Sequence, residues 1–147
     1  MKVSDILAVK GRRIVTVNHH LRADAIPARF DENGIGSLVV VDGNGRTIGI
    51  VTDRLFIKAL AHQKSGLAHL QAADVMETPA PSCGPETSVA EAMRIMIDRR
   101  LRHLVVIESG RPAGIVSIGD LVKARLGDYE LESRVLRDIA LGHLASE

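Results

Sequence analysis

Apolar and polar positions follow the same order twice along this chain. Residues 38–41 (LVVV) and 104–107 (LVVI) are short, mostly β-branched runs, typical of strands that are buried on both faces. A short polar segment with glycine follows each run, at residues 42–45 and 108–111, and an apolar phrase beginning Gly-Ile-Val comes next. The pattern predicts two β-hairpins.

Helical patterns flank both hairpins. Ahead of the second hairpin, Thr87 or Ser88 is the expected N-cap of a helix, and Glu91 is placed to complete a capping box. After the Gly-Ile-Val phrases, Thr52 and Ser117 are expected to cap two further helices. Apolar residues with helical spacing ahead of the second hairpin are Val89, Ala92, Met93, Met96 and Ile97.

The two halves of the chain repeat these features in one order. Each copy is predicted to be a βαββα unit of about 60 residues, which would be only marginally stable alone. We therefore expect the two units to pack their sheets into one core, in an α+β (α/β-like) fold with internal pseudo-twofold symmetry. The matched segments are residues 16–42 with 82–108, residues 56–60 with 121–125, and, less closely, residues 3–7 with 72–76.

We assign residues 1–64 to the first repeat, residues 65–128 to the second and residues 129–147 to a C-terminal helical tail. Residues 62–66 are expected to connect the repeats. The tail is expected either to pack on the body of the protein or to pair with a second chain, because apolar residues recur in it at helical spacing. These residues are Leu131, Val135, Leu136 and Ile139.

Composition excludes several classes of function. The 147 residues carry a net charge of +1 with only 2% aromatic residues, which argues against a nucleic-acid binder. Cys83 is the single cysteine, so neither an internal disulfide nor a multi-cysteine zinc site can form. The sequence has neither a membrane-spanning apolar run nor the pattern of a signal peptide at its start. We expect a soluble cytoplasmic protein that contacts neither nucleic acid nor membrane.

The ordered set of phrases, present twice, resembles a tandem pair of cystathionine beta-synthase (CBS) domains, a Bateman module. The phrases are SDIL and ADVM, the helix TSVAEAMRIM, the hairpin RHLVVIESGRPAGIVS and the closing SIGD. The resemblance covers nearly the whole chain. It implies a non-catalytic sensor, without a catalytic cofactor, that binds AMP, ADP, ATP, NAD or S-adenosylmethionine in clefts between the repeats.

The resemblance also assigns roles to particular residues. Ser117 and Asp120 match the family's Ser/Thr-x-x-Asp phrase, in which the carboxylate accepts hydrogen bonds from the ribose hydroxyls. Free N–H groups at the start of a helix favour a phosphate beside this phrase. The expected phosphate-binding residues are Arg100, Arg102 and His103, and the expected adenine slot is formed by Thr78, Pro79, Ala80, Pro81, Ile118 and Gly119.

Each of these residues also has a purely structural interpretation. Asp120 could be a surface acid favoured by the helix dipole, and Ser117 is a helix cap in either case. The arginines at positions 99, 100 and 102 could form a solvated face, and His103 could be a partly buried histidine.

The first repeat departs from the family phrase. Leu55 stands where the second repeat has Asp120, and Gly36 and Ser37 stand where it has Arg102 and His103. We therefore expect one adenosine site centred on Asp120 and a degenerate second cleft at Thr52, Arg54 and Ser37. This second cleft would be empty or would hold the remote half of a longer ligand such as NAD. Pro27 is expected to distort the first helix of this repeat.

Other candidate chemistry is weak. His19 and His20 are adjacent in a loop without further ligands at suitable spacing, so no metal site is expected. Cys83 is expected to be a buried apolar residue. We find no nucleophile and base at recognisable spacing, so we expect no enzymatic activity. The function expected is that of a homodimeric regulatory module that signals to an unknown effector protein; the alternative is an assembly subunit with a vestigial nucleotide site.

Overall fold

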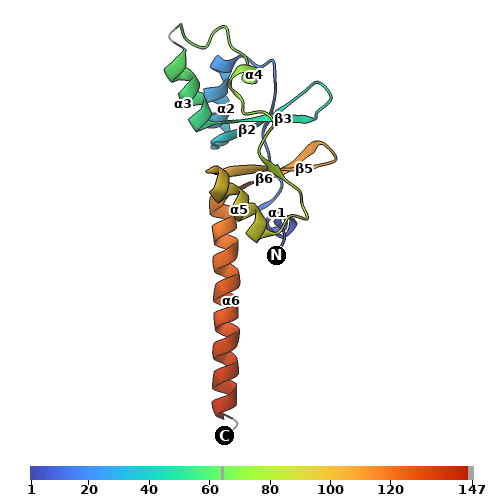
Figure 1. The fold of residues 1–147 in the computed structure, drawn as a ribbon, viewed down its shortest axis with the longest axis vertical. Coiled ribbons are helices and arrows are strands. Elements are labelled where there is room, and N and C mark those ends of the chain that lie inside the picture. Colours follow the sequence, from blue (N-terminus) through green and yellow to red (C-terminus); the bar gives the residue numbers. More distant parts are fainter. Residues whose placement is uncertain (64, 146–147) are drawn as a thin grey trace.

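The computed structural model describes residues 1–63 and 65–145. It has two small three-stranded sheets with helices on their outer faces, and this confirms the predicted α+β class (Figure 1). Lys64, in the predicted connection between the repeats, lies outside the described residues. The elements are α1 (Val3–Lys10), β1 (Thr16–Asn18), η1 (Ala23–Ala25), α2 (Ile26–Asn33), β2 (Ser37–Val41), β3 (Thr47–Thr52), α3 (Asp53–His62), α4 (Ala72–Val75), β4 (Ser82–Cys83), α5 (Val89–Arg99), β5 (His103–Glu108), β6 (Arg111–Ser117) and α6 (Ile118–Ala145).

The two sheets share one topology. In each, a short strand pairs parallel with the first strand of a hairpin, in the orders β1-β2-β3 and β4-β5-β6. Both hairpins are antiparallel, as predicted; Ser37 lies opposite Thr52 in one and His103 opposite Ser117 in the other. We call the residues just before β2 and β5 the pre-strand segments. Each of them therefore lies beside the junction at which the last strand of its hairpin, β3 or β6, passes into a helix.

Local sequence explains the helix starts. The Ser88 hydroxyl accepts a hydrogen bond from the Glu91 N–H at 3.1 Å, and the Thr52 hydroxyl accepts one from the Leu55 N–H at 3.2 Å. Pro27 has the effect that we expected. It sits in the first turn of α2, and the 3₁₀ turn η1 replaces the start of the continuous helix that the second repeat forms as α5.

The hydrophobic cores do not follow the boundary between the repeats. Val3, Ile6 and Leu7 of α1 pack against Leu104 and Leu121 of the second repeat. Short α4 packs in the opposite direction, into the core of the first repeat. Backbone hydrogen bonds fix both crossings, from the Val3 N–H to the Thr87 carbonyl at 2.8 Å and from the Ala72 N–H to the Leu21 carbonyl at 2.7 Å. Each sheet is thus completed by a helix from the other repeat.

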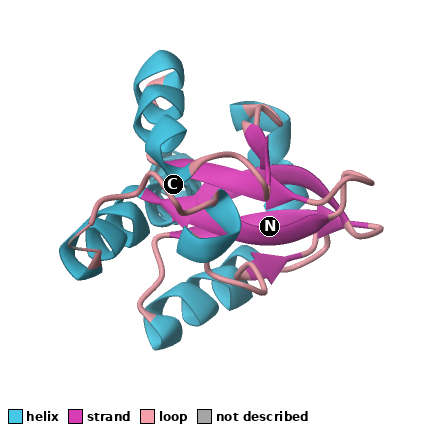
Figure 2. Cartoon of the chain, turned by 90° about the horizontal axis from the view of Figure 1, so that it is seen from above, coloured by secondary structure: helices cyan, strands magenta, loops and turns pink. Residues whose placement is uncertain are grey.

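A third cluster joins the two halves. Val39 and Ile50 of the first sheet pack with Val105 of the second sheet and with Ala80, all buried. Viewed from above, the strands lie at the centre of the molecule with helices around them (Figure 2). The expected packing of two units through their sheets is therefore present.

Helix α6 joins the predicted tail to the second repeat without a break. Its first turns pack through the buried Leu121, and the helix then extends away from the body (Figure 1). Leu131, Leu136 and Ile139 are all exposed, so the expectation that the tail packs on the body is wrong for the described residues. Residues 146–147 of the predicted tail lie outside the described part. Among described helices, none is long and apolar enough to span a bilayer.

Candidate functional site

A cavity of about 500 Å³ lies between the two repeats. We call it the basic cleft. The end of β3 and the start of α3 form one wall, and the segment 99–103, between α5 and β5, forms the other. Pro81, which comes just before β4, also lines this cavity. The residues that line this cleft are Ile50, Thr52, Asp53, Arg54, Leu55, Lys58, Glu77, Pro81, Arg99, Arg100, Leu101, Arg102 and His103.

Positive charge dominates this cleft. Arg54 and Lys58 are one turn apart on α3, and three arginines come from the other repeat. Two carboxylates, Asp53 and Glu77, oppose these five cations, and Glu77 lies 3.8 Å from the Arg99 guanidinium. The first N–H groups of α3 add a positive dipole end at the same place. The arrangement suits a ligand with several negative charges.

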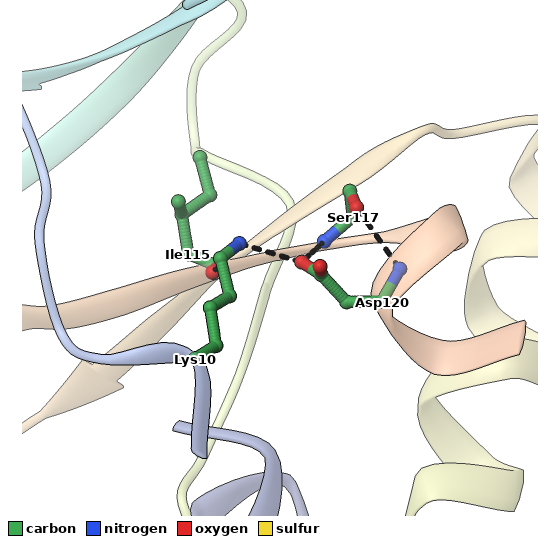
Figure 3. A network of polar contacts seen from close by, with 4 residues as sticks. All are labelled: Lys10, Ile115, Ser117 and Asp120. Atoms are coloured by element: carbon green, nitrogen blue, oxygen red, sulfur yellow. Dashed lines mark hydrogen bonds and ion pairs between the residues drawn. The ribbon is translucent and has the colours of Figure 1, made fainter. Parts of the chain in front are cut away.

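Asp120 lies in a different environment (Figure 3). Its carboxylate accepts hydrogen bonds from the Ser117 N–H at 2.8 Å and from the Lys10 ammonium at 2.5 Å. The Asp120 N–H donates in turn to the Ser117 hydroxyl at 3.1 Å. Burial opposes the charge of Asp120, but these hydrogen bonds outweigh it and hold the pKa of Asp120 below its ordinary value.

Lys10 also connects Asp120 to a second, smaller cavity. The Lys10 ammonium donates to the Ile115 carbonyl at 2.9 Å, and Ile115 lines a cavity of about 60 Å³. This volume is far below that of ordinary ligand pockets, whereas the basic cleft lies within their range. The other residues around the small cavity are Arg13, Ile14, Val15, Ile35, Ser37 and Val39.

The two cavities are equivalent under the internal repeat. In the sequence alignment, Ile115 matches Ile50, Ser37 matches His103, and Val15 matches Pro81. Each cavity therefore lies between the last strand of one repeat and the segment that precedes the hairpin of the other. The chain places five cations around one of these cavities, and it places its Ser-x-x-Asp phrase, paired with Lys10, beside the other.

The structure thus groups the predicted site residues differently. Arg100, Arg102 and His103 line the basic cleft with Thr52 and Arg54, which we expected to form part of the degenerate site. Ser117 and Asp120 contact Lys10 instead. Ser37, also expected in the degenerate site, lines the small cavity. The physical reason is the packing of the sheets, which brings each pre-strand segment against the opposite repeat.

The predicted adenine slot is also divided. Pro81 lines the basic cleft, and Ala80 is buried between the sheets. The Thr78 hydroxyl donates to the Ile48 carbonyl at 2.7 Å, and the peptide bond to Pro79 is cis. Ile118 and Gly119 lie in the first turn of α6, next to Ser117. They are distant in sequence from Thr78, Pro79, Ala80 and Pro81.

His103 stands between the two junctions. Burial lowers the pKa of its imidazole, and Asp53 and Asp120 oppose that shift only in part. The ring is therefore mostly neutral at pH 7 and adds little to the charge of the basic cleft. Arg102, beside it, is exposed and charged, and its carbonyl accepts a hydrogen bond from the Ile118 N–H at 2.9 Å.

Sequence reasoning missed Lys58 and Lys10. The spacing of Arg54 and Lys58, four residues apart on one helix, could have identified Lys58. Nothing in the sequence indicates Lys10, because its contact with Asp120 depends on α1 crossing to the second repeat.

The remaining candidates do not form a site. The rings of His19 and His20 stack with centroids 3.8 Å apart, and each has its own contact, to the Val41 carbonyl and to Gln71 respectively. Within residues 1–63 and 65–145, no cluster of three metal-ligating side chains occurs. Burial raises the pKa of the Cys83 thiol to about 11, so the thiol is protonated at pH 7.

Comparison with known proteins identifies the repeat. The CBS domain family matches residues 3–62 and residues 72–127. An uncharacterized 17.7 kDa protein of Acidianus ambivalens is 32% identical over 134 residues, which are 89% of this chain and 77% of that protein. The crystal structure of a CBS-domain protein from Agrobacterium tumefaciens is 37% identical, with a TM-score of 0.79 over 85% of this chain and 99% of that one.

A CBS domain protein from Pyrobaculum aerophilum, solved in complex with AMP, shares the fold. Its TM-score is 0.72 at 23% identity, over 82% of this chain and 89% of that one. The two matched segments coincide with the two sheets and their helices. The chain therefore belongs to the CBS domain family and contains a pair of its domains.

Proposed function

We propose that this protein is a regulatory module that binds a phosphorylated, adenosine-containing ligand in the basic cleft. One observation carries the proposal: five arginine and lysine residues from both repeats converge on a cavity of about 500 Å³ at the start of α3. The AMP complex of the Pyrobaculum relative supports an adenine nucleotide as the class of ligand. Because the cations outnumber the carboxylates, affinity rises from AMP to ADP to ATP.

The ligand is held mainly at its phosphate end. In this cleft, Leu55 occupies the position that corresponds to Asp120, so the ribose gains no hydrogen bond from that position. Ser117 and Asp120 form the weaker site, because the cavity beside them is small and Lys10 already occupies the carboxylate.

Binding in the basic cleft couples the two repeats. Arg54 belongs to one repeat and Arg102 to the other, so a phosphate between them favours one relative position of the two sheets. The protein catalyses no reaction itself, and the change of shape is read by a separate effector protein.

A thermal-shift and calorimetric titration tests this proposal. Wild type, Arg102→Ala, Asp120→Ala and the control Arg29→Ala, on exposed α2 outside the cleft, are each titrated with AMP, ADP, ATP, NAD, S-adenosylmethionine and GTP. We expect ATP to stabilise the wild type, and Arg102→Ala to weaken its binding by about tenfold or more. Asp120→Ala and Arg29→Ala keep wild-type affinity. If Asp120→Ala loses binding and Arg102→Ala does not, the ligand binds beside Asp120, at the smaller cavity, and the proposal is wrong.

An assembly subunit with a vestigial nucleotide site is the second candidate. It is favoured by the separation of the cations from the Ser-x-x-Asp phrase and by the ion pair between Lys10 and Asp120. If no ligand in the panel raises the melting temperature of the wild type at high excess, this second function replaces the first.

A further inference from the structure

Helix α6 exposes an apolar stripe with coiled-coil spacing. Val122, Leu126, Tyr129 and Leu136 lie at intervals of four, three and seven residues, with side chains 41% to 73% exposed. Ser133 and Ala140 complete the series as small residues. Positions 122, 126, 129, 133, 136 and 140 are therefore the a and d positions of a heptad repeat. We call this stripe the α6 seam.

A groove continues the α6 seam onto the body. It has a volume of about 310 Å³, and Met93 of α5 lines it together with Val122, Leu126 and Tyr129. Ile97 is one helical turn beyond Met93 on the same face of α5 and is 61% exposed. The apolar surface thus extends over two helices, and most of the stability of a helix in a protein comes from packing of such an apolar face.

We propose that the α6 seam pairs with the same seam of a second copy of this chain, in parallel and in register. The flanking charges identify this partner. In a parallel pair, a g position contacts the e position five residues later on the other helix. Arg125 would then face Glu130 of the second copy, and Glu132 would face Arg137, twice each by symmetry. All four contacts join opposite charges.

The other face of α6 is less suitable. Leu131 and Val135 are exposed there, but Asp128 and Asp138 occupy the neighbouring a and d positions of that stripe. Pairing through it would bury four carboxylates in a dimer without cations opposite them.

An antiparallel pair fits less well. In the register that brings Glu130 opposite Arg137, only two of the four charge contacts form.

This inference is independent of the proposed ligand, and the part of the α6 seam from Tyr129 onward lies beyond the family match, which ends at residue 127. Light scattering and sedimentation of the full chain are expected to give twice the 15.8 kDa of one chain. A monomeric mass at tens of micromolar protein would overturn the proposal.

Cysteine cross-linking determines the orientation. In a Cys83→Ser background, Leu136→Cys at a d position is expected to form a disulfide between two chains under mild oxidation, whereas Asp138→Cys, on the opposite face, is not. An equimolar mixture of Ser133→Cys and Leu136→Cys chains tests the antiparallel alternative. If a disulfide forms between the two different variants, and neither variant forms a disulfide with a second copy of itself, the pairing is antiparallel and the proposal is wrong.

Charge reversal tests the partner contacts. Arg137→Glu is expected to raise the dissociation constant of the dimer about tenfold, because it places like charges opposite Glu132 at two places. Arg134→Glu makes the same charge change away from the α6 seam and is expected to leave the constant unchanged. Adding Glu132→Lys to Arg137→Glu is expected to restore the dimer. If Arg134→Glu and Arg137→Glu have equal effects, the seam is not the interface.

Discussion

The lowered pKa of Asp120 depends in part on Lys10, which lies 110 residues earlier in the chain. The same Lys10 ammonium also donates to the Ile115 carbonyl, so one flexible side chain ties α1 to the end of β6. Arg102 and Arg54 illustrate the opposite case, in which cations from distant segments share a cavity with few acids. At the level of single residues, the two equivalent clefts therefore differ in charge: five cations line the basic cleft, whereas the smaller one is lined by Arg13 and lies beside the ion pair of Lys10 and Asp120.

Replacing Lys10 with methionine removes the ion pair but keeps the length of the side chain. Since the pKa of Asp120 is lowered in the folded state, its contribution to stability is present above its ordinary pKa of 3.8 and is lost as pH falls through the lower, folded value. We expect Lys10→Met to lower the free energy of unfolding by about 1 kcal/mol at pH 7. The difference from wild type is expected to shrink below pH 3.8.

Urea unfolding at several pH values measures this difference. Asp120→Asn is the matched partner, and the double variant is expected to lose less than the sum of the two single variants, because both remove one interaction. A loss for Lys10→Met that is equal at pH 7 and at pH 3 would show that the ion pair does not stabilise the fold.

Two glycines at matching positions of the repeats explain how the helices cross. A Cβ on Gly49 would lie 2.5 Å from the Met76 Sδ and 2.8 Å from the Glu77 carbonyl oxygen. A Cβ on Gly114 would lie 2.8 Å from a methyl carbon of Leu7. In both repeats, glycine allows an element from the other half of the chain to approach the strand closely.

The two glycines differ in what surrounds them. The Glu77 backbone is held by hydrogen bonds to Ile50 in both directions, at 2.9 and 3.1 Å, whereas the Leu7 side chain can change its rotamer. We expect Gly49→Ala to cost about 2–3 kcal/mol of stability and Gly114→Ala about 1 kcal/mol or less. Differential scanning calorimetry of the two variants checks the order, and a reversed order would contradict it.

Elements also differ in how well the sequence predicts them. The hairpins, the Ser88 and Thr52 caps and the effect of Pro27 were predictable because each depends on residues close together in the chain. The composition of the clefts was not. Whether Arg102 faces Asp120 or Arg54 depends on how two sheets pack, and the alignment of repeats has no information on contacts between them. The crossing of α1 was missed for the same reason.

The exchange of helices makes the two halves depend on one another. The Leu7→Ala substitution lies in the first repeat, but its side chain packs in the core of the second. We expect it to destabilise the protein by about 2–5 kcal/mol and to speed amide hydrogen exchange first in β5 and β6. Faster exchange confined to β2 and β3 would contradict the crossed arrangement.

The crossing of α1 and α4 also has a consequence for the order of events during synthesis. The first half of the chain cannot complete its core until Ala72 and Val75 have left the ribosome, and α1, made first, lacks its partners until Leu121 has been made. The apolar face of the first repeat therefore stays uncovered until α4 is made, and that of α1 until most of the second repeat is made. A nascent chain that stalls in the connection between the repeats would be a substrate for chaperones and proteases, although all of the first repeat has been translated.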